Sequence, residues 1–191
     1  MTAGSRPVVV AMAPNSKLFI PPVTDAGLGV KRVYLSLGSN RGDRVTNIRE
    51  AVEKLASVGV KVQRLSSYYK TEPVGFGPQA WFLNCVAEAA TGLMPMQLLK
   101  AVKSVEWALG RRPGVTNGPR PIDIDILLYE NVVVRSAKLT IPHERMNERR
   151  FVLVPLREIA PAARHPVTKR TVDEMLQDLK DLSRVVRFKK D

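Results

Sequence analysis

The segment Asn117–Tyr129, NGPRPIDIDILLY, decides the fold because its second half predicts a strand with two different faces. Apolar side chains occupy one face (Ile122, Ile124, Ile126 and Leu128), and Asp123 and Asp125 occupy the other. Residues i and i+2 of a strand share a face, so the two carboxylates should lie roughly 6–7 Å apart. The apolar face predicts packing under helices. The carboxylate face should stay accessible, because burying unpaired charges is costly.

The two carboxylates are candidate ligands for Mg²⁺, which prefers carboxylate oxygens and keeps positions free for phosphate oxygens. Gly118–Pro121 predicts a stiff turn that delivers Arg120 beside them, and an arginine next to a carboxylate–metal pair is typical of phosphate transfer. An Asp-x-Asp pattern alone is also typical of an exposed strand with two solvated aspartates. The GPRP turn and the isoleucine face favour the metal site.

The composition predicts one globular domain with anionic partners. A hydrophobic content of 45% in 191 residues is enough for a single core, and the net charge of +12 favours nucleotides, nucleic acid or a membrane surface. Cys85 is the only cysteine, so nothing points to an oxidising compartment, and we expect a cytoplasmic location, with organelle targeting left open. We expect no membrane partner, since no apolar run has spanning length.

The order of predicted elements is β-α-β-β-α-β, which indicates an α+β, ferredoxin-like core: an antiparallel sheet with both helices on one face and the aspartates on the open face. The predicted strands are 33–37, 60–69 (with a bulge near Gln63 and Arg64), 81–90 and 122–128, and helices run from Asp43 to Gly59 and from Pro95 to Gly110. A C-terminal hairpin (132–134 with 139–141) and helices 149–159 and 171–179 follow.

The ends of the chain are predicted to lie outside the core. Residues 1–30 are rich in Pro, Ala, Gly and Ser and predict an extension or linker before a domain of residues 31–191. Arg187, Lys189 and Lys190 predict a solvated tail.

Three further features leave alternatives open. Phe82 and Asn84 share a strand face that suits a stacked heterocycle, although two residues fit an ordinary mixed face better. The turn at Gly38–Asn40 resembles a phosphate cradle but lacks the lysine of a P-loop, which favours a structural turn. Third, His143 is either a structural histidine or a phosphate ligand. Separately, the Gly- and Pro-rich loop Pro113–Pro121 is a candidate lid.

Four motifs together resemble the 6-hydroxymethyl-7,8-dihydropterin pyrophosphokinase family of the folate pathway, over about residues 32–166. They are YLSLGSNRGDR (34–44), TEPVGFGPQAWFLN (71–84), GPRPIDID (118–125) and LTIPH (139–143). The resemblance implies a ferredoxin-like core, MgATP as donor and dihydropterin as acceptor. It also implies transfer of the β,γ-pyrophosphoryl group with release of AMP.

The resemblance implies a role for each matched residue. Asp123 and Asp125 would bind two Mg²⁺ ions and, with Arg111 and Arg120, form the catalytic set. The pterin would lie between Phe82 and Phe151 and contact Asn84, Thr71, Glu72 and Val74. The nucleotide would contact Glu106, Arg111, Arg120, Ile126, Thr140, His143 and Arg149. Departures from the family pattern at Pro113, Asn117 and Glu144 bear on the closed geometry of the lid.

Two other classes compete with this interpretation. A basic ferredoxin-like sheet is also typical of an RNA-binding module, but two carboxylates on its open face argue against nucleic acid. A metal-dependent nucleotide-sugar transferase would explain Asp-x-Asp but leaves Phe82, Asn84 and LTIPH unexplained. We therefore expect ATP and hydroxymethyldihydropterin as partners, and a monomer that is linked to or works beside other folate-pathway enzymes.

Overall fold

The computed structural model describes residues 29–73, 79–112 and 118–189. Val74, Pro113, Asn117, most of the candidate lid and nearly all of the N-terminal extension lie outside these ranges. The domain boundary near residue 31 therefore stays a prediction.

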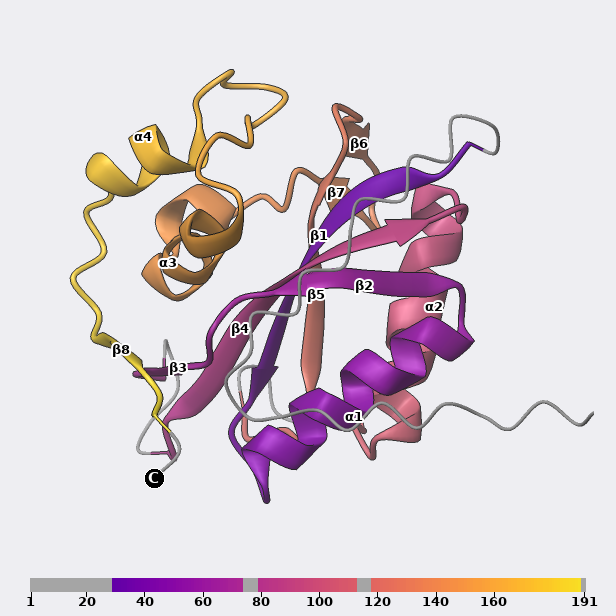
Figure 1. Ribbon diagram of the computed structural model, residues 1–191, viewed down its shortest axis with the longest axis vertical. Helices are drawn as coiled ribbons and strands as arrows, with labels where there is room; N and C mark the ends of the chain where they lie inside the picture. Colours follow the sequence, from indigo (N-terminus) through magenta and orange to yellow (C-terminus); the bar gives the residue numbers. More distant parts are fainter. Residues whose placement is uncertain (1–28, 74–78, 113–117, 190–191) are drawn as a thin grey trace, which may run out of the picture.

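The first part of the chain alternates strands and helices in the predicted order (Figure 1). Its elements are β1 (Lys31–Ser39), α1 (Arg44–Ser57), β2 (Val60–Leu65), β3 (Tyr69–Thr71), β4 (Phe82–Thr91), α2 (Pro95–Ala108) and β5 (Asp123–Tyr129). The second part consists of β6 (Val134–Arg135), β7 (Thr140–Ile141), the short 3₁₀ turn η1 (Met146–Glu148), α3 (Arg150–Ile159), α4 (Val172–Gln177) and β8 (Val185–Arg187). β6 and β7 form the predicted hairpin as a separate two-stranded sheet.

The main sheet is antiparallel and ferredoxin-like, as predicted, with the order β5-β1-β4-β3-β8 and with β2 also paired to β4. The prediction of one strand over 60–69 is wrong, because β2 and β3 are separate pieces that pair with opposite ends of β4. Between them the Ser66 hydroxyl accepts the N–H of Val86 at 3.0 Å, where a continuous ladder would use a main-chain carbonyl. The predicted bulge is confirmed by a register shift between Val62 and Arg64.

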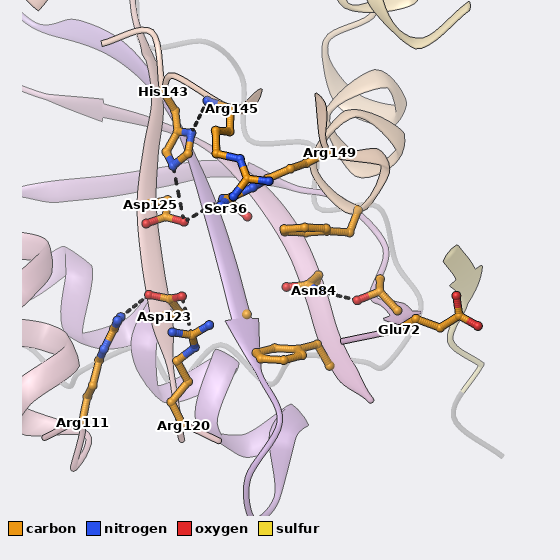
Figure 2. Close-up of a pocket in the computed structure, with 14 residues that line it drawn as sticks. Ser36, Glu72, Asn84, Arg111, Arg120, Asp123, Asp125, His143, Arg145 and Arg149 are labelled. Carbon is orange, nitrogen blue, oxygen red and sulfur yellow. Dashed lines mark hydrogen bonds and ion pairs between the residues drawn. The ribbon is translucent and has the colours of Figure 1, made fainter. Parts of the chain in front are cut away.

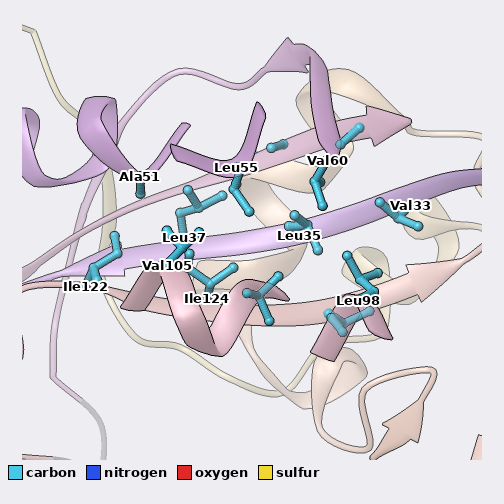
Figure 3. Close-up of a cluster of buried hydrophobic side chains, with 14 of the residues drawn as sticks. Val33, Leu35, Leu37, Ala51, Leu55, Val60, Leu98, Val105, Ile122 and Ile124 are labelled. Atoms are coloured by element: carbon cyan, nitrogen blue, oxygen red, sulfur yellow. The ribbon is translucent and has the colours of Figure 1, made fainter. Parts of the chain in front are cut away.

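Helices α1 and α2 pack on one face of the sheet and bury the main core (Figure 3). Ile122 and Ile124 are at most 1% exposed there, which confirms the predicted apolar face of β5. The prediction is wrong for Leu128, which packs with Leu127 in a second cluster on the opposite face. The reason is a register shift where β5 passes Tyr34 and Leu35 of β1, which reverses the alternation.

Helices α3 and α4 lie on the other side of the sheet from α1 and α2 (Figure 1). Val86 and Leu127 are buried there against apolar residues of α3, so the expected open face is wrong in this part. Cys85 is fully buried on the face toward α1 and α2, and burial raises the pKa of its thiol. In the part of the chain that the structure describes, no helix has the length and apolar character to cross a membrane.

The C-terminal segment adds the strand β8, which the sequence did not predict. Its pairing with β3 places Arg187 opposite Tyr69, so Arg187 belongs to a strand, although its side chain is 63% exposed and solvated as predicted. The Arg187 guanidinium donates to the Ser67 hydroxyl at 2.6 Å and lies 3.7 Å from the Glu158 carboxylate. Short strands of this kind depend on a free partner edge, which β3 supplies here.

Candidate active site

A cavity of ≈ 340 Å³ opens on the part of the sheet that α3 leaves uncovered. Its lining comes from four strands (β1, β3, β4 and β5), three loops and the start of α3 (Figure 2). The lining residues are Ser36, Gly38, Thr71, Glu72, Phe82, Asn84, Arg111, Arg120, Asp123, Asp125, His143, Arg145, Arg149 and Phe151. Eleven of the predicted pterin, metal and phosphate positions therefore face one space, with arginines and carboxylates at one end and aromatic rings at the other.

Two neighbouring rows of residues cross the sheet beneath the cavity. In the first, which we call the open row, Gly38 of β1 pairs with Asp123 on one side and with Asn84 on the other. Directly paired residues point to the same face, so the carboxylate and the carboxamide flank a position without a side chain. A Cβ atom at Gly38 would lie 2.4 Å from Asn84 Oδ1. The glycine thus keeps the floor of the cavity free beside Asn84.

The second row, which we call the packed row, crosses β1 two residues before Gly38. Here Ser36 pairs with Asp125 and with Val86. Ser36 is 6% exposed and Val86 is fully buried in the cluster under α3. Asp125 and the small Ser36 line the first cavity, while the Val86 end of this row is covered by α3.

Asp123 is surrounded by two arginines. Its carboxylate contacts Arg111 Nη1 and lies 3.2 Å from Arg120 Nε (Figure 2). Burial alone would raise the pKa of Asp123, but the two guanidinium groups outweigh it and lower that pKa. Asp123 is therefore held as a carboxylate, the form that binds metal ions.

Arg111 is held from behind by Glu106, which lines neither of the two cavities among the described residues. Glu106 is 3% exposed, and its Oε1 accepts hydrogen bonds from Arg111 Nη1 at 2.6 Å and from the Ile124 N–H at 2.7 Å. Burial raises the pKa of Glu106, against the opposing effect of Lys103 and Arg111. The structure thus places the predicted nucleotide residue Glu106 behind Arg111.

Asp125 has looser partners. Arg149 Nη1 and His143 Nε2 lie 3.8 Å and 3.9 Å from its carboxylate. Burial lowers the pKa of His143, although Asp125 opposes this, and the imidazole Nδ1 accepts the Arg145 N–H at 3.1 Å. In the neutral imidazole the ring proton is then on Nε2, the atom that faces Asp125.

Arg120 is anchored by the turn after β1. The Asn40 carboxamide oxygen accepts the Arg120 N–H at 2.8 Å, and the Asn40 N–H donates to the Arg120 carbonyl at 3.2 Å. This role supports the structural interpretation of the turn at Gly38–Asn40. The buried Arg120 Nε makes no hydrogen bond with any residue in the described ranges, which suits a site that receives an anion.

The aromatic end of the cavity contains Phe82, the first residue of β4, and Phe151, at the start of α3. Between these elements the Asn84 carboxamide donates to the Thr71 hydroxyl at 2.7 Å, and both side chains are buried. The Arg120 guanidinium lies 5.5 Å from the Phe82 ring centroid. Apolar rings beside a fixed carboxamide can stack on and orient a flat heterocycle.

A second cavity of ≈ 390 Å³ meets the first at Asp125 and His143, which line both. The predicted nucleotide residues Ile126 and Thr140 line this second space. Sequence reasoning missed Ser36, Gly38 and Arg145 in the first cavity, and Lys103, Ser136 and Lys138 in the second. Ser36 and Gly38 had a signal: Ser36 is a small residue of the predicted strand 33–37, and Gly38 continues the alternation two positions later.

The acidic residues present fit a metal that arrives with phosphate. Within the ranges described, no three His, Cys, Asp or Glu side chains gather into a metal-binding group. Asp123 and Asp125 alone would leave most positions of Mg²⁺ for phosphate and water oxygens, which is how this ion commonly binds in nucleotide enzymes.

The fold and these two joined cavities define a ferredoxin-like protein that is built to hold a polyphosphate beside a flat ring. The chain belongs to the 7,8-dihydro-6-hydroxymethylpterin-pyrophosphokinase (HPPK) family, whose family model matches residues 34–161. This confirms the resemblance drawn from the four motifs.

Relatives of two lengths match the chain. It is 43% identical to a 2-amino-4-hydroxy-6-hydroxymethyldihydropteridine pyrophosphokinase of Aquifex aeolicus over 74% of this chain and 88% of the relative. It is 42% identical to the mitochondrial folate synthesis bifunctional protein of Pisum sativum, over 79% of this chain but only 28% of the relative. The solved Plasmodium falciparum HPPK-DHPS wild type with STZ-DHP superposes with a TM-score of 0.63 at 14% identity, over 78% of this chain and 43% of that one. At that identity the likeness supports the fold alone.

Proposed function

We propose that this chain is an ATP-dependent pyrophosphokinase that converts 6-hydroxymethyl-7,8-dihydropterin and ATP to the pterin diphosphate and AMP in folate biosynthesis. Membership of the HPPK family and the names of its relatives support the activity. The observation that carries the proposal is the position of Asp125, which lines both cavities beside Asp123. A triphosphate at this junction would be within reach of a nucleoside in the second cavity and of a flat ring in the first.

The pterin would occupy the aromatic cavity and the nucleoside the second cavity. Phe82 and Phe151 would stack on the ring, while Asn84 would bind its polar edge. Ile126 and Thr140 would contact the nucleoside. The triphosphate would then extend toward Arg111, Arg120 and the two aspartates.

The reaction would be an in-line displacement at the β-phosphorus. The pterin hydroxymethyl oxygen forms the new O–P bond, the bond between the β-phosphorus and the α,β-bridging oxygen breaks, and AMP leaves with that oxygen. The hydroxyl proton is released to solvent. Arg111 and Arg120 would stabilise the negative charge on the phosphates, and the cavity walls would align the reacting atoms.

Asp123 and Asp125 would hold the two Mg²⁺ ions of the reaction. Bound there, the ions would supply charge neutralisation and orientation of the triphosphate. The low pKa of Asp123 supports this assignment, because it keeps the carboxylate ionised. His143 and Arg149, next to Asp125, would contact phosphate oxygens.

The test is product analysis with the purified chain, ATP, hydroxymethyldihydropterin and Mg²⁺. We expect AMP and pterin diphosphate in equal amounts, and no activity after chelation with EDTA until Mg²⁺ is restored. Formation of ADP with a pterin monophosphate would refute the proposal. Since several relatives are longer folate synthesis proteins, we also propose that the domain works beside other folate enzymes.

A further inference from the structure

The two walls of the aromatic cavity are both attached to one short segment near the C-terminus. Glu72, directly after β3, forms part of one wall, and Arg149 and Phe151, at the start of α3, form part of the other. Residues Asp181–Arg184, which we call the C-terminal strap, run between α4 and β8 and contact both. The strap itself does not line the cavity.

Asp181 holds the wall that begins α3. Its Oδ2 accepts the N–H of Arg150 at 2.8 Å, and its Oδ1 accepts the N–H of Ser183 at the same distance. Arg149, the N-cap residue of α3, makes no capping hydrogen bond with its own side chain. Asp181 thus supplies the cap from elsewhere in the chain, at the residue between Arg149 and Phe151.

The charge of Asp181 suits this position. Burial would raise the pKa of Asp181, but the hydrogen bonds from the two N–H groups outweigh it and lower that pKa. A carboxylate is also favoured at a helix N-terminus by the helix dipole. The contact is therefore charge-assisted and directional.

Arg184 holds the opposite wall through its main chain. The Arg184 N–H donates to Glu72 Oε2 at 2.9 Å, and the Arg184 carbonyl accepts the Glu72 N–H at 3.3 Å. Figure 2 shows the Glu72 carboxylate turned away from Asp123 and Asp125, which fits this attachment outside the cavity. Next in the chain, Val185 of β8 pairs with Thr71, which binds Asn84.

We propose that the C-terminal strap sets the width of the aromatic cavity, and that Asp181 is a positioning residue for Phe151. This inference rests on the proposed function, because the flat ligand that the cavity would hold is the pterin. Phe82 is fixed by the sheet, so the separation of the two rings depends on where α3 begins. Loss of the Asp181 contact frees the first turn of α3 and weakens stacking on the ring.

The experiment compares Asp181→Ala, Asp181→Asn and the wild type by steady-state kinetics with each substrate varied in turn. We expect Asp181→Ala to raise KM for the pterin about tenfold, with kcat and KM for ATP changed less than about threefold. Asp181→Asn keeps one acceptor oxygen for the Arg150 N–H but places an NH2 group toward the Ser183 N–H, so its pterin KM should lie between those of the wild type and Asp181→Ala. Asp178→Ala is the matched control: its side chain is 69% exposed and pairs with Arg170 outside the strap.

The outcomes separate this proposal from the proposed function. If the wild type is active and the folded Asp181→Ala variant has an unchanged KM for the pterin, the proposed function stands and the proposal about the strap is overturned. An equal loss of kcat and of affinity for both substrates in Asp181→Asn, with a lowered melting temperature, also overturns it, since that pattern is a general loss of structure. A wild type that forms no AMP refutes the proposed function and the strap with it.

Discussion

The open row and the packed row differ in what lies on them, although they are adjacent on the same strands. In the open row, Gly38 leaves space between Asp123 and Asn84. In the packed row, Val86 is covered, Ser36 reaches the cavity with only 6% of its surface exposed, and Asp125 is the most accessible member. The aspartates differ in the same way: Asp123 is tightly paired with arginines, while the partners of Asp125 lie 3.8–3.9 Å away. One strand can thus present two carboxylates of the same type in different electrostatic surroundings.

Removal of the Asp123 or the Asp125 carboxylate should have the largest effect on activity. The two variants should differ in stability, because only Asp123 is tightly paired. We expect Asp123→Ala and Asp125→Ala each to lower kcat/KM by about 10³-fold or more, because charge neutralisation at the phosphates supplies several kcal/mol. Asp123→Ala should also lower the free energy of unfolding by about 1–2 kcal/mol, since it leaves Arg120 without its carboxylate and Arg111 with Glu106 alone. Asp125→Ala should change it by less than about 0.5 kcal/mol. Urea unfolding without metal measures both, and equal destabilisation would contradict the comparison.

Filling the gap in the open row should impair pterin binding. In Gly38→Ala the new Cβ would meet Asn84 Oδ1 at 2.4 Å, so the carboxamide must move. We expect KM for the pterin to rise about tenfold while KM for ATP stays within about twofold, because a displaced hydrogen-bonding group is worth roughly 1 kcal/mol or more. Gly92→Ala is the control, since nothing lies within 4 Å of a Cβ there. A Gly38→Ala enzyme with normal pterin affinity would show that Asn84 is not a ligand contact.

The smallest expected effect is on the pH dependence of stability. The pKa of Asp123 is lowered in the folded state, so its ion pairs stabilise the fold fully above the unfolded pKa of about 3.9 and are lost as the pH falls through the lower folded value. Between about pH 5 and about pH 2, the urea midpoint of the metal-free wild type should therefore fall more steeply than that of Asp123→Asn. Parallel curves would mean that the arginines do not stabilise the ionised form.

Local patterns predicted much of the fold, because each depends on residues close in sequence. Alternation placed Ile122 and Ile124 in the core, and Asp43 and Pro95 marked the helix starts. Leu128 was misplaced because the bulge depends on how β5 pairs with β1. That pairing cannot be seen in the sequence of β5 alone. The same holds for β8, whose three residues form a strand only because β3 offers an edge.

The site could be predicted only in part from the residues themselves. The Asp-x-Asp pattern and its arginine follow from chemistry within nine residues, whereas Phe82 and Phe151 come together through the packing of α3 on the sheet. Their pairing came from the family resemblance. Gly38 could have been found by extending the alternation of β1, because a small residue between two polar positions leaves space. Asp181 carries no local signal of its contact with Arg150.

The bare main chain at Gly38 has a consequence for inhibitor design. A compound that rests on this glycine gains contacts with backbone atoms, which a point mutation cannot delete. Resistance at this position would require added atoms, and those would displace Asn84, on which the natural substrate is proposed to depend. Escape from such a drug would therefore also slow growth that relies on the enzyme.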